Sequence, residues 1–164
     1  MAFFSKFFGN SDSDSDDDNP IAWFKGEDPG MQKAIELAQQ NYPKFASAVK
    51  KDAQRIVPAA EATLMKYAFP AQKRGVEVEH MFLGDIYFDG ENIVGTLASE
   101  PMYTRKVKEG DEVIVNPERV TDWVIVIDGK CHGGYTFKFM WKNFSKEERR
   151  MYAEHPPFEW MDLD

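Results

Sequence analysis

A run of short, alternating segments between residues 76 and 140 constrains the fold of this chain more than any other feature. Apolar and polar residues alternate through VEVEHMFLGDIYF, as in a strand with one buried face. Asp89-Gly90 and Asp128-Gly129 are hairpin signals, so the strands that flank each pair are expected to be antiparallel. The uninterrupted apolar run WVIVI predicts a central strand that is buried on both faces.

Turn residues and changes in period set the limits of the expected strands. Period-two alternation predicts a first strand from Ala62 to Phe69, which ends at Pro70. Lys130–Met140 is expected to be the last strand, and Gly133-Gly134 inside it indicates a bulge or a close approach to the backbone. In the strand that starts at Val76, strict alternation places one set of residues on a single face: Val76, Val78, His80, Phe82, Gly84, Ile86 and Phe88.

Helices are expected before and after the strands. Asp28-Pro29 combines an N-cap residue with proline in the first turn. Pro43 is expected to end or kink this helix, and a second short helix should follow it. Ser145 and Glu148 fit a capping box at the start of a short C-terminal helix. The order of elements predicts an α+β fold, in which a mainly antiparallel twisted sheet of about five to six strands carries N-terminal helices packed on it and a short C-terminal helix.

The sequence divides into an N-terminal segment of unusual composition and a single domain. Residues 1–19 combine four phenylalanines with an acidic block, and this segment is expected to be a disordered, self-repelling linker. Residues 20–164 are expected to form one α+β domain, with the sheet core at 61–140 and a C-terminal helix and tail at 145–164. Contact of the phenylalanines with a membrane is not favoured, because anionic lipid would repel the acidic block. The phenylalanines in question are Phe3, Phe4, Phe7 and Phe8.

Composition narrows the classes of function and the compartment. The 164 residues carry a net charge of -8, and half of it comes from residues 1–19, where five aspartates stand against one lysine. The rest of the chain is only mildly acidic and has no basic stripe, which argues against duplex nucleic acid as a partner. The single cysteine, Cys131, excludes an internal disulfide framework and favours a reducing compartment. No apolar run approaches the roughly 20 residues of a membrane span, so we expect a cytoplasmic protein.

The sequence offers no catalytic or metal-binding constellation. His80 shares a strand face with apolar residues, which favours a structural histidine that is satisfied by a backbone or carboxylate partner. His132 follows Cys131 directly, and successive strand residues point to opposite faces, so these two side chains do not make a nucleophile and its base. No C-x-x-C or H-x-x-x-H spacing occurs. We therefore predict no catalytic residue, no metal ion and no cofactor.

Several short motifs resemble a known bacterial family. Glu79-His80-Met81, Asp128-Gly129 and the segment from Asp122-Trp123 to Gly133-Gly134-Tyr135-Thr136 stand in an order that resembles the YegJ-like bacterial domain of unknown function. The resemblance covers roughly residues 28–140 and leaves the N-terminal tail and everything after Met140 outside it. It implies an α+β fold but supplies no reaction, because the family has no settled activity.

These observations favour a non-catalytic protein-binding module. A small acidic cytoplasmic protein fits an immunity or antitoxin-type protein, which neutralises a basic partner such as a toxin through charge complementarity. The alternative is a small enzyme or small-molecule-binding domain with a pocket near His80, Lys130 and Tyr135. The residues selected for binding are His80, Asp122, Trp123, Lys130, Gly133, Gly134 and Tyr135.

Overall fold

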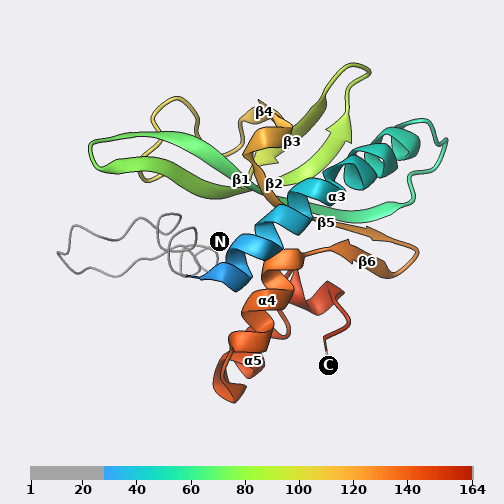
Figure 1. Ribbon diagram of the computed structural model, residues 1–164. Helices are drawn as coiled ribbons and strands as arrows, with labels where there is room; N and C mark the ends of the chain where they lie inside the picture. Colours follow the sequence, from blue (N-terminus) through green and yellow to red (C-terminus); the bar gives the residue numbers. More distant parts are fainter. Residues whose placement is uncertain (1–27, 164) are drawn as a thin grey trace.

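The computed structural model describes residues 28–163, which form one six-stranded antiparallel sheet with helices on both faces. The elements are α3 (Pro29–Ala53), β1 (Ala60–Lys73), β2 (Val76–Phe88), β3 (Ile93–Leu97), β4 (Glu112–Ile114), η1 (Pro117–Arg119), β5 (Val120–Ile127), β6 (Lys130–Gly133), α4 (Tyr135–Asn143), α5 (Lys146–Tyr152) and η2 (Phe158–Trp160). The strand order is β4-β3-β2-β1-β5-β6. Figure 1 shows α3 crossing the sheet diagonally, with α4 and α5 below it. The expected α+β class is confirmed, whereas the expectations for residues 1–19 lie outside the described residues.

Helix α3 is one continuous helix where two were expected. Asp28 caps it, because its Oδ1 accepts hydrogen bonds from the N–H groups of Gly30 at 2.9 Å and Met31 at 3.2 Å. Pro43 lies inside the helix and does not end it. The buried stripe keeps its helical period past Pro43, and its packing outweighs the hydrogen bond that proline removes. The stripe consists of Met31, Ala34, Ile35, Ala38, Tyr42, Phe45 and Val49.

The first hydrophobic core fills the space between α3 and the sheet. Trp123 of β5 is central to it, since its side chain is 3% exposed and its Nε1 donates to the carbonyl of Ala38 at 2.9 Å. Phe45 packs on the Trp123 ring with the centroids 5.4 Å apart. Tyr135, the first residue of α4, meets the same ring edge-on at 5.8 Å. Trp123 is thus a core residue of a buried central strand, as the apolar run predicted, and it joins α3 and α4 to β5.

The second hydrophobic core lies on the opposite face of the sheet, between the strands and the C-terminal elements. Phe158 in η2 is 2% exposed and meets Phe137 of α4 edge-on at 5.8 Å. The C-terminal tail therefore folds back on the domain. Ser145 and Glu148 make the expected capping box at the start of α5. The buried members of this core are Leu64, Phe82, Val124, Phe137, Phe158 and Met161.

A bulge in β2 changes which side chains face each core. Asp85 has a φ angle of 48°, and the pairing of β2 with β3 shifts between Gly84 and Tyr87. The extra residue turns Ile86 and Phe88 toward the first core and Tyr87 to the other face. The prediction of strict alternation was therefore wrong beyond Gly84.

Strand β6 is short and leads directly into α4. Gly133 and Gly134 have φ angles of 86° and 74°, so both are left-handed, and the helix starts at Tyr135. A Cβ atom on Gly133 would overlap the carbonyl oxygen of Trp123, which confirms the expected close approach to the backbone. The prediction of a strand to Met140 was wrong. The residues after the double glycine form an amphipathic helix because their apolar side chains pack into the second core.

Strand β1 is longer than expected and continues past Pro70 to Lys73. Pro70 pairs with Val78, and a register shift separates this pair from the next one, Lys73 with Val76. Proline fits a strand at such an irregularity because it has no N–H to donate to the ladder.

Candidate functional site

Asp122, one of the predicted binding residues, holds the start of α4. It is 0% exposed, and Gly134 at the helix start has no side chain with which to cap α4. The Asp122 carboxylate caps it instead from β5: Oδ1 accepts the N–H of Tyr135 at 3.1 Å, and Oδ2 accepts the N–H of Thr136 at 2.7 Å and its hydroxyl at 2.5 Å. Oδ1 also accepts the N–H of Trp123 at 2.8 Å. The carboxylate is therefore fully engaged by the protein itself.

A buried lysine lies beside this carboxylate. Lys66 of β1 is 4% exposed and stands opposite Asp122 in the pairing of β1 with β5. Burial lowers the pKa of Lys66 to about 8, and the negative charge of Asp122 opposes that shift. Burial likewise raises the pKa of Asp122, while the hydrogen bond from Thr136 and the charge of Lys66 lower it. The ammonium lies 5.7 Å from the centroid of the Phe137 ring, so it also packs against α4.

His80 joins the same group of polar side chains. It is half-buried on β2, and its Nδ1 lies 3.3 Å from Oγ1 of Thr121. The Thr121 hydroxyl also donates to the carbonyl of Lys66 at 3.3 Å. We call Lys66, His80, Thr121, Asp122 and Thr136 the inner polar cluster. Its contacts link three central strands to α4, so the geometry gives it the role of fixing that helix on the sheet.

Five of the seven predicted binding residues lie together in the fold. Asp122, Trp123, Gly133, Gly134 and Tyr135 converge where β5, β6 and α4 meet, and they build the fold there. The remaining two, His80 and Lys130, lie apart from one another.

The pocket expected near His80, Lys130 and Tyr135 does not form from these three side chains. Lys130 is exposed and pairs with Ile127, whose side chain packs on the first core beneath α3. Tyr135 packs on that same core, whereas His80 belongs to the inner polar cluster on the opposite face of the sheet.

Part of one face of the sheet is left uncovered, which the sequence did not predict. The second core contains no residue of β3 or β4. Tyr87 of β2 and Ile114 of β4 lie on this part, with 42% and 63% of their side chains exposed. Both residues pair with Val94 of the intervening β3, so they flank it on one face. The bulge at Asp85 turns Tyr87 to this face, and the sequence carries no separate signal for that bulge.

Two carboxylates lie close to the exposed Tyr87. The Tyr87 hydroxyl donates to Oε1 of Glu112 at 2.8 Å. That hydrogen bond, followed by smaller effects that include the charges of Glu112 and Asp89, raises the pKa of Tyr87. We call Tyr87, Asp89, Glu112 and Ile114 the acidic strand face. It combines an aromatic and an aliphatic side chain with two negative charges.

Two kinds of feature are absent from residues 28–163. Among residues 28–163, no group of three or more His, Cys, Asp and Glu side chains is arranged to hold a metal ion. In the same part of the chain, no helix has both the length and the apolar character that a membrane span requires.

Comparison with known proteins places the domain in a family. Residues 28–160 match the family described as an uncharacterized protein conserved in bacteria, DUF2314. The chain belongs to this family. The match extends past Met140, where the resemblance was expected to end, and takes in the C-terminal elements of the second core.

Two relatives are similar over most of the chain. A protein of Neisseria meningitidis serogroup B, named as an ankyrin repeat protein, is 32% identical over 133 residues, which is 80% of this chain and 53% of that protein. The uncharacterized protein YegJ of Escherichia coli K12 is 28% identical over 119 residues, which is 72% of this chain and 71% of YegJ. The chain thus spans about half the length of the Neisseria relative. No solved structure matches the chain.

Proposed function

We propose that this domain is a non-catalytic protein-binding module that binds a basic partner on the acidic strand face. The exposure of Tyr87 and Ile114 among the carboxylates of Asp89 and Glu112 carries the proposal. Exposed apolar side chains that lie together mark interaction surfaces, and tyrosine is common among residues that anchor an interface. The neighbouring carboxylates favour lysine and arginine on the partner.

The free edge of β4 supports the same proposal. Among residues 28–163, β4 pairs only with β3. The N–H of Val115 donates to the carbonyl of Ile93 at 2.9 Å, so the backbone of Val115 faces β3. Backbone groups alternate in direction along an antiparallel strand, and those of Ile114 and Glu112 therefore point away from β3. An extended segment of a partner can pair with this edge while its basic side chains reach the carboxylates.

A basic toxin is the partner class that we favour, and the domain would then act as an immunity or antitoxin-type protein in the cytoplasm. Complementary charge speeds association with such a partner and excludes acidic competitors. One relative is named as an ankyrin repeat protein, and repeats of that class present extended binding surfaces. That association is consistent with use of this domain in protein recognition.

The test is affinity capture from native lysate with the full chain at low and at high salt, read by mass spectrometry. The variant that carries Tyr87→Ser and Ile114→Ser should lose the partner. Met151→Ser is the matched control, because Met151 is 52% exposed on α5, away from the acidic strand face. The captured partner should be basic, should dissociate as salt rises and should lose its own activity when bound. Equal capture by the double variant, or a partner whose binding is insensitive to salt, would contradict the proposal.

A further inference from the structure

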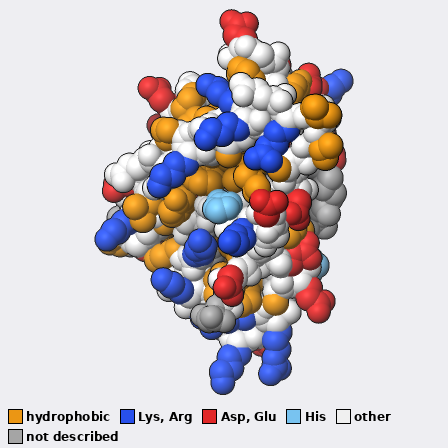
Figure 2. Space-filling view, turned by 90° about the vertical axis from the view of Figure 1, so that its right-hand side faces the viewer, with side chains coloured by type: hydrophobic (Ala, Val, Ile, Leu, Met, Phe, Trp, Pro, Cys, Tyr) orange, Lys and Arg blue, Asp and Glu red, His pale blue; other side chains and the backbone are white. Residues whose placement is uncertain are grey.

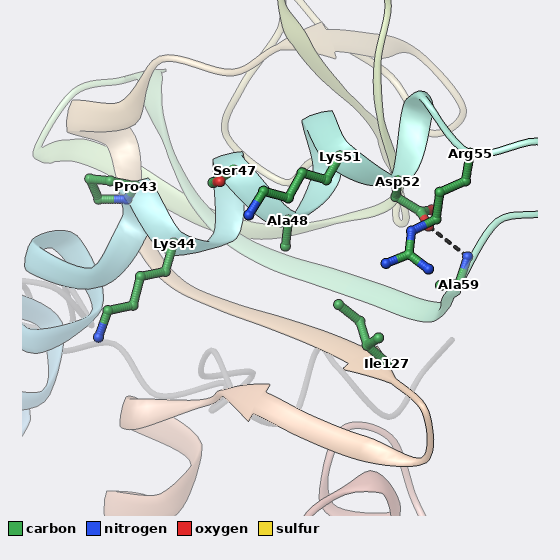
Figure 3. Close-up of a pocket in the computed structure, with 9 residues that line it drawn as sticks. All are labelled: Pro43, Lys44, Ser47, Ala48, Lys51, Asp52, Arg55, Ala59 and Ile127. Carbon is green, nitrogen blue, oxygen red and sulfur yellow. Dashed lines mark hydrogen bonds between the residues drawn. The ribbon is translucent and has the colours of Figure 1, made fainter.

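A groove lies on the other side of the molecule, between the C-terminal half of α3 and the ends of β1 and β5. It has a volume of about 480 Å³. Figure 3 shows Lys44 and Lys51 on α3 and Arg55 just after its end, all beside this groove, with Ile127 of β5 on the opposite side. Ala48 and Ile127 give the groove an apolar floor, and the three cations border it.

The three cations are not neutralised by the folded domain. Within residues 28–163, the side chains of Lys44, Lys51 and Arg55 are exposed and make no ion pair or hydrogen bond. The carboxylate of Asp52 also lines the groove, but its Oδ1 accepts the N–H groups of Ala59 at 2.6 Å and Ala60 at 3.2 Å. The groove therefore has an excess of positive charge in a protein whose net charge is -8.

Strand β6 places the cation of Lys130 and the imidazole of His132 on the same side of the sheet as the groove. Lys130 pairs with Ile127, and His132 pairs with Ile125. Directly opposed residues project from the same face of an antiparallel pair, and Ile125 and Ile127 face α3. The side chains of Lys130 and His132 therefore project on the α3 side of the sheet, where both are exposed. Figure 2 shows Lys and Arg side chains gathered with exposed hydrophobic surface on this side of the molecule.

Two aliphatic side chains project from the loop at the end of the groove. Ile56 is 101% exposed and Val57 is 77% exposed, and they directly follow Arg55. Neither contributes to a core of the domain. Large aliphatic side chains that stand fully in water next to uncompensated cations indicate a surface that another molecule covers.

We propose that this groove binds an extended acidic segment of a partner protein, in which carboxylates alternate with aliphatic residues. Lys44 and Lys51 are seven residues apart, which is about 10.5 Å along the helix, and Arg55 follows the end of α3. Alternate side chains of an extended peptide are about 6.6 Å apart, so carboxylates in such a segment can meet the cations in succession. The residues between them would lie on Ala48 and Ile127 and against Ile56.

The position of the groove favours a ligand whose carboxylates are spread along a chain and disfavours a compact phosphate group. Lys51 stands in the last turn of α3 and Arg55 just after it, and the C-terminal end of a helix carries partial negative charge, which disfavours a concentrated anion. The residues that line the groove include no aromatic side chain on which a base could stack. The proposal is independent of the acidic strand face, which lies at the opposite edge of the sheet.

Fluorescence anisotropy with the full chain and a labelled peptide, DLEVDLE, tests the proposal, and the peptide NLQVNLQ is the uncharged control. The double variant Lys51→Gln, Arg55→Gln should weaken binding about tenfold at low salt, since each exposed ion pair contributes modestly. Lys142→Gln with Lys146→Gln removes the same charge from exposed positions on α4 and α5 and should leave binding within about twofold. Ile56→Ser with Val57→Ser should weaken binding about threefold at both low and high salt.

Other occupants of the groove give different results. If the chain's own aspartates at residues 12–18 occupied it, the peptide would bind only to a variant with those aspartates replaced by asparagine. If a second copy of the chain occupied it, sedimentation would show a wild-type dimer that Lys51→Gln, Arg55→Gln converts to a monomer. Either result would overturn the proposal, as would unchanged peptide affinity in the Lys51, Arg55 double variant.

Discussion

Lys66 on β1 lies directly opposite Asp122 on β5, and both side chains are removed from solvent, with 4% and 0% exposure. Asp122 also accepts the N–H of Thr136, so the pair connects two central strands with the start of α4. A buried pair of opposite charges tolerates the loss of one member poorly, because the other charge is left without compensation.

Replacing the carboxylate should therefore be costly to the fold. Asp122→Ala is expected to lower the free energy of unfolding by roughly 3–5 kcal/mol. The substitution removes the negative charge beside the Lys66 ammonium and the acceptor of the N–H groups at the start of α4. Urea denaturation followed by circular dichroism measures the change. Asp162→Ala is the control, because Asp162 is an exposed aspartate of the C-terminal tail. A loss of less than about 1 kcal/mol for Asp122→Ala would mean that the carboxylate does not cap α4 in solution.

The buried lysine should make stability depend on pH in the alkaline range. Burial lowers the pKa of Lys66 to about 8, from 10.5 for an exposed lysine. Between these two values the unfolded chain binds more protons than the folded protein, so this group's contribution to the free energy of unfolding rises with pH. The rise is at most about 3 kcal/mol across the interval.

The comparison with Lys66→Met isolates this effect. Unfolding by urea at intervals from about pH 7 to about pH 11 should show the wild type gaining stability relative to the variant as pH rises through the interval. Parallel curves for the two proteins would show that Lys66 keeps an ordinary pKa in the folded state.

The double glycine before α4 gives a test of the strand-to-helix junction. A Cβ on Gly133 would overlap the carbonyl oxygen and ring of Trp123, whereas one on Gly90 would meet nothing within 4 Å. Both glycines have positive φ angles, 86° and 106°. Gly90→Ala should therefore cost only the backbone strain, about 1–2 kcal/mol, and Gly133→Ala should cost about 1–3 kcal/mol more through overpacking. Thermal unfolding measures the difference, and equal melting temperatures for the two variants would contradict this prediction.

Features that are set by residues close together in the sequence could be predicted from it. Asp28 caps α3, Ser145 starts the capping box of α5, and Asp128-Gly129 connects β5 to β6. Two expectations failed because tertiary packing decided them. Pro43 stays inside α3 because the buried stripe on both sides of it packs on one sheet, and the residues after Gly134 are helical because their apolar face covers the second core.

The candidate surfaces were less predictable than the fold. Trp123 and Asp122 stand in recognisable motifs, and the structure shows that they hold α3 and α4 on the sheet. Tyr87 and Ile114 have ordinary strand sequences around them, and only the extent of α4 and α5 decides that they stay exposed. The same holds for Ile56, whose exposure depends on how the loop after α3 leaves the helix.

The bulge at Asp85 determines which side of β2 carries Tyr87, and it can be tested through its backbone. Asp85 has a φ angle of 48°, a conformation that aspartate tolerates and a β-branched residue does not. Asp85→Val is therefore expected to lower the free energy of unfolding by about 1–2 kcal/mol. Glu77→Val is the control at an exposed position of the same strand, where valine should be neutral or stabilising. Urea unfolding decides the matter: if the two valine variants were equally stable, the left-handed bulge, and with it the outward position of Tyr87, would be contradicted.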